Sequence, residues 1–236
     1  MKKDLRYFLR YIEKHAPELL LQVPGEVNPR WELSAVQKRL EVDRRLPVLQ
    51  FQKVIGSTMP VISNLFASKT HLALALETTP EKVIPRFTDA QVNGLAPRNV
   101  KSGPVKDVVL AGDNVDLNVL PIVTHCEKDA GPYLSSGVTI MRDPVSGSLN
   151  AGIYRNLVTS PTTLTMNMAP LCHGSEIAAD AEKAKHHVEA AIVVGHHPAL
   201  AISSQQRGQR SELELNTMGA LLEEPLDMVP AETIDL

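Results

Sequence analysis

The stretch Asp129–Arg155, with the sequence DAGPYLSSGVTIMRDPVSGSLNAGIYR, is the most informative part of this 236-residue chain. Two predicted strands flank its turn sequence, Asp143–Gly147 (DPVSG). Proline presets one backbone angle of such a turn, and glycine supplies an angle that other residues resist. We therefore predict a β-hairpin, which fixes where Asn150 and Arg155 emerge from its second strand.

The composition is that of a globular protein with ample material for a core. Hydrophobic residues make up 43% and charged residues 22% of the chain, and the formal net charge is −3. The length suggests one large or two small domains. The basic residues form no tail or cluster, so we expect no nucleic-acid partner. The two cysteines, Cys126 and Cys172, are not spaced as a metal-binding pair, which favours a reducing compartment.

The N-terminal sequence and the hydropathy pattern both favour a cytoplasmic protein. Charged residues occur too early in MKKDLRYFLRYIEKHAPE for the apolar segment of a signal peptide. No uninterrupted apolar run approaches the length that crosses a membrane. We therefore expect a cytoplasmic protein without a membrane span.

Residues 1–100 are expected to form a small α/β lobe. Leu5, Phe8, Leu9 and Ile12 have helical spacing, Asp4 is a suitable N-cap, and Pro17 ends this first helix. The polar, turn-rich sequence at 96–104 (APRNVKSGP) predicts a domain boundary. Further helices are predicted at 31–40, 68–76 and after Thr79-Pro80, and strands at 19–23 and around 49–53.

Residues 101–236 are expected to form a β-rich second lobe, which makes the fold class α/β (α+β). Separators rich in Asp, Gly, Pro and Ser divide the predicted strands. The strands are predicted at 108–110, 133–141, 149–158, 164–168 and 191–194, and helices at 175–188 and 211–222.

Asn150, His173 and Glu214 are candidate metal ligands that lie far apart in the sequence. Two oxygen ligands and one nitrogen ligand suit Mn²⁺ or Mg²⁺ better than a metal that prefers sulfur. Structural roles are open as well: His173 could cap a helix, and Glu214 could lie on a solvated helix face. Among the other histidines, we expect His186-His187 to be exposed and His196-His197 to lie in a loop or helix cap.

Several blocks of the sequence, taken together, resemble the UbiD family of prenylated-flavin-dependent decarboxylases. They occur in the family's order and extend over essentially the whole chain. The blocks are PVLQFQKVIGSTMPVISNLFAS (47–68), LPIVTHCEKDAGPY (120–133), SGVTIMRDPVSG (136–147), NAGIYR (150–155) and GALLEEPLDMV (219–229).

The resemblance implies that residues 101–236 form a split β-barrel domain of UbiD type that binds prenylated FMN. It implies that Asn150, His173 and Glu214 hold Mn²⁺ (or Mg²⁺), which clamps the phosphate of the cofactor. It further implies a K⁺ ion held near Ser203 and Ser204. The residues implied to bind the cofactor are Asn150, Gly152, Ile153, Tyr154, Arg155, Cys172 and His173.

Arg155 corresponds by the same resemblance to the family's catalytic arginine. A guanidinium is permanently charged and can grip a carboxylate through two parallel hydrogen bonds. Pairing with a surface acid is the structural alternative. Because Asn150 and Arg155 are five residues apart, a flat strand would point them to opposite faces. Serving one cofactor would require a bulge, for example at Gly152, or a strand that curls.

The implied function is reversible, non-oxidative decarboxylation of an aromatic or α,β-unsaturated carboxylic acid. A flavin prenyltransferase would supply the cofactor, and the full-length form would be a homo-oligomer. The family's catalytic glutamates belong to an E-G-P-F-G-E block that this sequence does not contain. The chain is therefore expected to be an incomplete and inactive N-terminal portion. Two alternatives remain open: an FMN-binding split-barrel oxidoreductase, and a non-catalytic truncated partner subunit.

Overall fold

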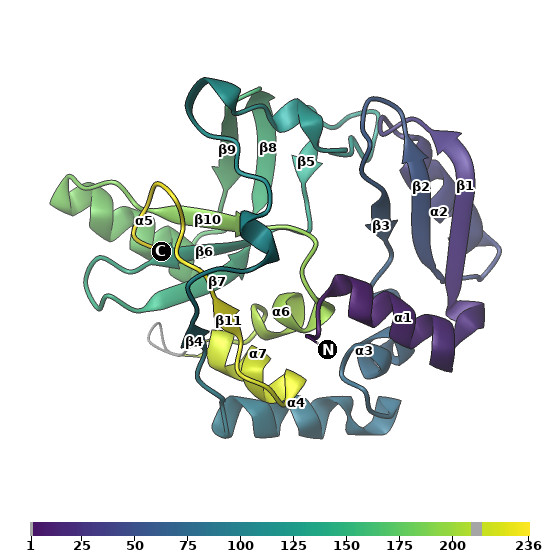
Figure 1. The fold of residues 1–236 in the computed structure, drawn as a ribbon, viewed down its shortest axis with the longest axis horizontal. Helices are drawn as coiled ribbons and strands as arrows, with labels where there is room; N and C mark the ends of the chain where they lie inside the picture. The colour runs from purple at the N-terminus through teal and green to yellow at the C-terminus, as the bar shows by residue number, and fades with distance from the viewer. Residues whose placement is uncertain (1, 209–213) are drawn as a thin grey trace. The chain divides into compact units, whose positions relative to one another are not determined.

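A computed structural model describes residues 2–208 and 214–236 as an alternation of short strands and helices (Figure 1). The helices are α1 (Leu5–His15), α2 (Glu32–Val42), α3 (Lys69–Ala75), α4 (Val83–Val92), α5 (His173–Ala184), α6 (Pro198–Ser203) and α7 (Glu214–Leu222). The strands are β1 (Leu20–Val27), β2 (Val48–Val54), β3 (Val61–Ser63), β4 (Arg98–Asn99), β5 (Tyr133–Leu134), β6 (Val138–Arg142), β7 (Leu149–Ile153), β8 (Arg155–Ser160), β9 (Thr163–Asn167), β10 (Ala190–Val193) and β11 (Asp227–Met228). This mixture confirms the predicted fold class.

The chain packs as two compact units that are interleaved in sequence. The first unit comprises the chain up to Glu81 together with Leu110–Leu134 and Arg155–Met166. The second comprises Lys82–Val109, Ser135–Tyr154 and the chain from Asn167 onwards. The predicted division into residues 1–100 and 101–236 stays a prediction.

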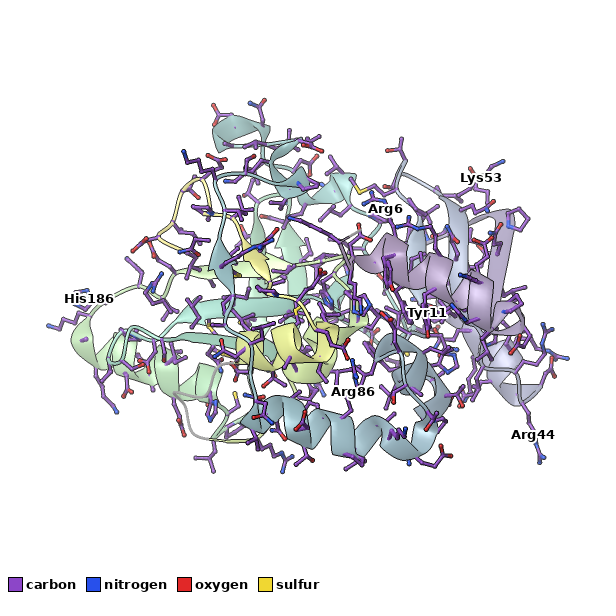
Figure 2. The ribbon with its side chains drawn as sticks, turned by 60° about the horizontal axis from the view of Figure 1, so that its bottom comes forward. Arg6, Tyr11, Arg44, Lys53, Arg86 and His186 are labelled. Carbon is purple, nitrogen blue, oxygen red and sulfur yellow. The ribbon has the colours of Figure 1, made fainter. Side chains whose placement is uncertain are left out.

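In the first unit, a sheet of order β1-β2-β3 carries the main apolar core. β1 runs parallel to β2, and β2 runs antiparallel to β3. Leu49 and Phe51 of the predicted strand are both fully buried, whereas Lys53 is exposed and points outward (Figure 2). The register with β1 shifts at the same place, between Val23 and Glu26.

The first helix begins and ends as its sequence predicts. The Asp4 carboxylate accepts a hydrogen bond from the Tyr7 backbone N–H at 2.6 Å, which satisfies a free donor of the first turn. Phe8 and Ile12 are the buried residues of α1. A 3₁₀ turn starts at Pro17, where the α-helix could not continue.

In the second unit, an antiparallel sheet of order β10-β6-β7 is packed against helices α5 and α7 (Figure 1). α7 also packs against α4 and α6, and the guanidinium of Arg86 on α4 donates to the Leu221 carbonyl oxygen at 3.0 Å. β4 and β11 form a short parallel pair. All sheets of the described residues have two or three strands, and none closes into a barrel.

Two long predicted strands are each interrupted where the chain changes sheets. The strand predicted at 133–141 is divided into β5 and β6, and that predicted at 149–158 is divided into β7 and β8. β6 and β7 belong to the sheet of the second unit, whereas β5 and β8 pair with each other in a β5-β8-β9 sheet. A continuous run of strand-forming residues does not reveal where pairing partners change.

Other sequence predictions differ from the structure in detail. The strand predicted at 108–110 is wrong, because these exposed residues form no strand. The helix predicted at 211–222 is described from Glu214 onwards, and its first residues lie outside the described part of the chain. Helix α6 was not predicted, because its six residues are too few to show helical periodicity.

Burial of a histidine should make the first unit sensitive to mild acid. His71 on α3 is 1% exposed, and its Nδ1 lies 2.8 Å from the Ser68 hydroxyl. Burial lowers the pKa of His71 below its ordinary 6.5, and a backbone hydrogen bond with Leu46 offsets only part of this shift. The unfolded chain therefore binds the proton first, and stability falls as the pH drops below about 6.5.

We expect His71→Gln to flatten this acid dependence of the unfolding free energy. One proton contributes at most about 1.4 kcal/mol per pH unit. Urea unfolding at pH 7.5 and pH 5.5 measures the difference. His186→Gln is the matched control, because His186 is exposed and projects from the protein beyond α5 (Figure 2). Equal pH dependence in wild type and His71→Gln would contradict this role of His71.

Candidate cofactor and metal site

The predicted β-hairpin is present and places Asn150 in the interior of the second unit. The Asp143 carboxylate accepts hydrogen bonds from the Val145 N–H and the Ser146 hydroxyl, both at 2.8 Å, and Gly147 has a positive φ of 72°. The turn thereby closes as its sequence predicts. Asn150 lies on β7 opposite Met141 of β6 and is 3% exposed.

The structure brings Asn150, His173 and Glu214 together, although 64 residues separate the first from the last. His173 is the first residue of α5 and Glu214 the first residue of α7, and both helices pack against β7. Asn150 Nδ2 lies 3.1 Å from Glu214 Oε1 and 3.5 Å from His173 Nδ1. The structural alternative for Glu214 is therefore wrong. Glu214 is 3% exposed and does not lie on a solvated helix face.

Glu214 is a buried carboxylate whose charge is only partly compensated. Burial raises the pKa of Glu214. Hydrogen bonds from backbone N–H groups, including that of Ala151 at 3.2 Å, the neighbouring His173 and the Asn150 amide act in the opposite direction. Within the described part of the chain, no Lys or Arg forms an ion pair with it. A buried anion in this position favours a bound cation.

The donor set fits a divalent ion that prefers oxygen and nitrogen. The cluster offers an imidazole and one carboxylate, each within hydrogen-bonding distance of the Asn150 amide. It contains only two residues of the His, Cys, Asp and Glu types, and the described residues contain no group of three or more of these types arranged for a metal. An ion held here would need further ligands, such as cofactor phosphate or water, as Mn²⁺ and Mg²⁺ commonly have.

Tyr154 adjoins the cluster from the end of β7. Its hydroxyl donates to Asn150 Oδ1 at 3.2 Å, and its side chain is buried. Burial raises the pKa of Tyr154 to about 12, with smaller contributions in the same direction from Cys172 and Glu214. The phenol is therefore a neutral hydrogen-bonding group at physiological pH. The sequence predicts Tyr154 as a cofactor residue but does not indicate its contact with Asn150.

The remaining predicted cofactor residues flank the cluster in sequence. Gly152 is buried on β7, and Ile153, the last residue of that strand, is half-buried. Cys172 is half-buried at the N-cap position of α5, where its carbonyl oxygen accepts a hydrogen bond from the Ser175 hydroxyl at 2.8 Å.

Arg155 begins β8 in the first unit, directly after Tyr154, and is exposed. The register of β6 with β7 is continuous through Gly152, so the bulge suggested there is absent. Instead, the extended chain leaves one sheet after Ile153 and enters another at Arg155. Strand alternation across residues 150–155 therefore does not determine the relation of Arg155 to Asn150.

Ser203 and Ser204, the predicted potassium-site residues, lie at the C-terminal end of α6. Both are buried, and their hydroxyls donate to the carbonyl oxygens of Leu200 and Ala201 at 3.0 and 2.9 Å. α6 packs against α7, the helix that begins with Glu214. The hydroxyls thus hydrogen-bond within the helix itself, and the potassium site stays a prediction.

Four other histidines are exposed or form hydrogen bonds with the backbone. His186 and His187 are exposed, as predicted. His197 is the N-cap of α6 and accepts a hydrogen bond from the Ala199 N–H at 3.1 Å, which confirms the predicted cap. His196 Nε2 lies 3.1 Å from the Ser136 carbonyl oxygen, a contact that the sequence did not suggest.

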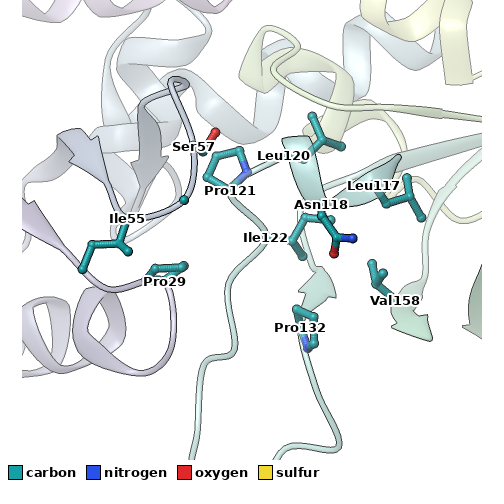
Figure 3. Close-up of a pocket in the computed structure, with 11 residues that line it drawn as sticks. Pro29, Ile55, Ser57, Leu117, Asn118, Leu120, Pro121, Ile122, Pro132 and Val158 are labelled. Carbon is teal, nitrogen blue, oxygen red and sulfur yellow. The ribbon is translucent and has the colours of Figure 1, made fainter. Parts of the chain in front are cut away.

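A separate pocket of about 200 Å³ lies in the first unit (Figure 3). Its walls include Ile55, Leu117, Ile122 and Val158, and none of the predicted site residues lines it. Its volume is below the roughly 300–1,000 Å³ of typical small-molecule pockets. We therefore assign it no part in the site.

Comparison with known proteins identifies the family. The model of the 3-octaprenyl-4-hydroxybenzoate carboxy-lyase Rift-related domain (UbiD) matches residues 98–236. The model of the corresponding carboxy-lyase N-terminal domain matches residues 13–91. The chain therefore belongs to the UbiD family, as its sequence blocks predicted.

Individual relatives include decarboxylases and flavin complexes. The UbiD-class enzyme HmfF from Pelotomaculum thermopropionicum in complex with FMN is 34% identical and superposes with a TM-score of 0.91, over 98% of this chain and 51% of that chain. An evolved dimeric form of HmfF in complex with prFMN is 33% identical, with a TM-score of 0.92, over 99% of this chain and 54% of that chain. Anhydromevalonate phosphate decarboxylase from Methanothermobacter thermautotrophicus is 29% identical over 96% of this chain and 51% of its own length. The present chain thus spans about half the length of these relatives.

No helix within residues 2–208 and 214–236 combines the length and the apolar character needed to cross a bilayer.

Proposed function

We propose that this chain is the cofactor- and metal-binding portion of a UbiD-type carboxy-lyase that uses prenylated FMN. In this proposal, Asn150, His173 and Glu214 hold Mn²⁺ or Mg²⁺, and the ion binds the cofactor phosphate. The observation that carries the proposal is the buried Glu214 carboxylate, placed beside an amide and an imidazole without a cationic side-chain partner among the described residues. Membership of the UbiD family supports the choice of prenylated FMN as the cofactor.

In this proposal, the chain's own residues bind and orient the metal and the cofactor. The electron sink that removal of CO₂ from an unsaturated carbon requires comes from prenylated FMN, when bound. Glu214 supplies negative charge to the divalent ion, and the neutral groups of Asn150 and His173 complete the protein's share of the ligands. Residues Gly152, Ile153, Tyr154 and Cys172 flank these ligands in sequence and would border the cofactor.

Arg155 is the proposed residue for recognition of the substrate carboxylate. Its guanidinium forms no ion pair within the described part of the chain and is exposed at the start of β8. A fork of N–H donors can hold an aromatic or α,β-unsaturated acid with its carboxylate fixed for CO₂ release or capture. Lysine could not reproduce this planar contact.

Three further parts of the proposal follow from the family. A K⁺ ion would lie near the backbone of Ser203 and Ser204, supported by the packing of α6 against α7. A flavin prenyltransferase would supply the cofactor, and the full-length protein would form homo-oligomers.

Native mass spectrometry of the chain co-produced with a flavin prenyltransferase tests the proposal. We expect a bound mass equal to prenylated FMN plus one divalent ion, and we expect it to be lost in Asn150→Ala and His173→Ala. His186→Ala, at an exposed histidine, should retain the full mass. Unmodified FMN that survives chelation would instead favour the oxidoreductase alternative. A chain without any flavin or metal would contradict cofactor binding by this portion alone.

A further inference from the structure

The side chain of Tyr154 connects the strand that carries Asn150 with the helix that carries His173. Its hydroxyl donates to Asn150 Oδ1 at 3.2 Å. The backbone N–H of Gly174, the residue that follows His173, forms a hydrogen bond with the same phenol oxygen. One hydroxyl thus contacts the first proposed metal ligand directly and the second through its neighbour in the chain.

Two glycines on different elements make room for this phenol ring. A methyl group on Gly152 of β7 would lie 2.5 Å from the Tyr154 hydroxyl oxygen and 2.7 Å from Cζ. A methyl group on Gly174 of α5 would overlap the same hydroxyl and approach Met141 Cε to 2.9 Å. Gly152 lies within a strand, where glycine is usually unfavourable, and both glycines leave space that the phenol ring fills.

The hydroxyl restrains the Asn150 amide on one side. Rotation of an amide by half a turn exchanges a donor for an acceptor at the same place, and only the oxygen can bind a metal. A tyrosine hydroxyl can donate to Oδ1 or accept from Nδ2, so it can hold the amide in place in either orientation. A phenylalanine ring would occupy the same space between Gly152 and Gly174, but it has no hydroxyl to restrain the amide on that side.

We propose that Tyr154 is a positioning residue of the metal site, acting by restraining the Asn150 amide and by tying it to the start of α5. The inference rests on the proposed function, because it concerns the same metal. It assigns Tyr154 no contact with the metal or the substrate.

The test is a Mn²⁺ titration of wild type and Tyr154→Phe, followed by the EPR signal of free Mn²⁺ with and without added FMN. Groups that orient metal ligands typically contribute about 10–100-fold to metal affinity, and we expect a loss in this range for Tyr154→Phe. Gly152→Ala, which displaces the ring but keeps the hydroxyl, should also weaken Mn²⁺ binding. Tyr133→Phe, at a half-buried tyrosine on β5, should match wild type.

Thermal unfolding separates positioning from a merely structural role. A structural defect would lower the melting temperature of the metal-free protein but leave the increment produced by Mn²⁺ unchanged. Positioning predicts that this increment shrinks in Tyr154→Phe. If wild type and Tyr154→Phe bind Mn²⁺ with equal affinity, the inference is overturned and the proposed function stays intact. Wild type that binds no Mn²⁺ under either condition would overturn both.

Discussion

Replacing Glu214 with glutamine is expected to reduce Mn²⁺ affinity by more than about 100-fold, beyond the 10–100-fold typical of residues that only orient ligands. Glu214 is the one anionic member of the Asn150, His173 and Glu214 cluster, and it is 3% exposed. Glutamine keeps the size of the side chain but removes the negative charge that attracts the ion. Isothermal titration calorimetry with Mn²⁺ measures the effect.

The matched control for this prediction is Glu176→Gln. Glu176 lies in the first turn of α5, near His173 in sequence, but its side chain is exposed. The substitution changes the net charge by the same amount, so a general electrostatic effect would lower affinity in both variants. Retention of Mn²⁺ binding in Glu214→Gln, or equal losses in the two variants, would contradict a role for Glu214 as a ligand.

Phe51→Ala is expected to destabilise the first unit by about 3–5 kcal/mol, the usual cost of removing a fully buried aromatic ring. Phe51 is 0% exposed on β2 and belongs to a cluster with Val27, Leu33, Leu49 and Val54. Neighbouring side chains fill only part of the resulting cavity. The second unit, which contains the proposed metal cluster, has its own packing and should be affected less.

The fluorescence of Trp31, the single tryptophan, reports on this unit during urea unfolding. Its ring is contacted by the Arg30 guanidinium at 4.5 Å in the native state. Phe66→Ala is the control, because Phe66 is 42% exposed, and surface substitutions usually change stability by less than about 0.5 kcal/mol. A Phe51→Ala midpoint equal to that of Phe66→Ala would show that the β1-β2-β3 core does not limit the stability of this unit.

Local signals in the sequence predicted local structure well. Asp4 predicted the start of α1, and the residues Asp143–Gly147 predicted the turn of the β6–β7 hairpin. In each case the residues that make the hydrogen bonds are within a few positions of one another, so the pattern contains the whole interaction.

Interactions between distant residues could not be derived in the same way. Nothing local indicates that Glu214 lies beside Asn150; the contact exists because α7 packs against β7. The family resemblance suggested the set, and the structure shows only that its members are neighbours. The change of sheets at Tyr154 was also hidden, because residues on both sides of it favour strands.

The sequence contains only a partial indication of the space beside Tyr154. Gly152 lies within a predicted strand, where glycine is unfavourable, whereas Gly174 directly precedes a predicted helix, where glycine is well tolerated. Their shared neighbour, however, became visible only when β7 and α5 were seen against each other.

The position of the metal is the most direct test of the central claim, and anomalous diffraction at the manganese edge measures it. Crystals of the chain grown with MnCl₂ and FMN should give one strong anomalous peak within coordination distance of Asn150, His173 and Glu214. Such a peak, absent from crystals of Glu214→Gln, would establish the cluster as the metal site. A strong peak elsewhere in the protein, at an Mn²⁺ ion that none of these three side chains contacts, would contradict it.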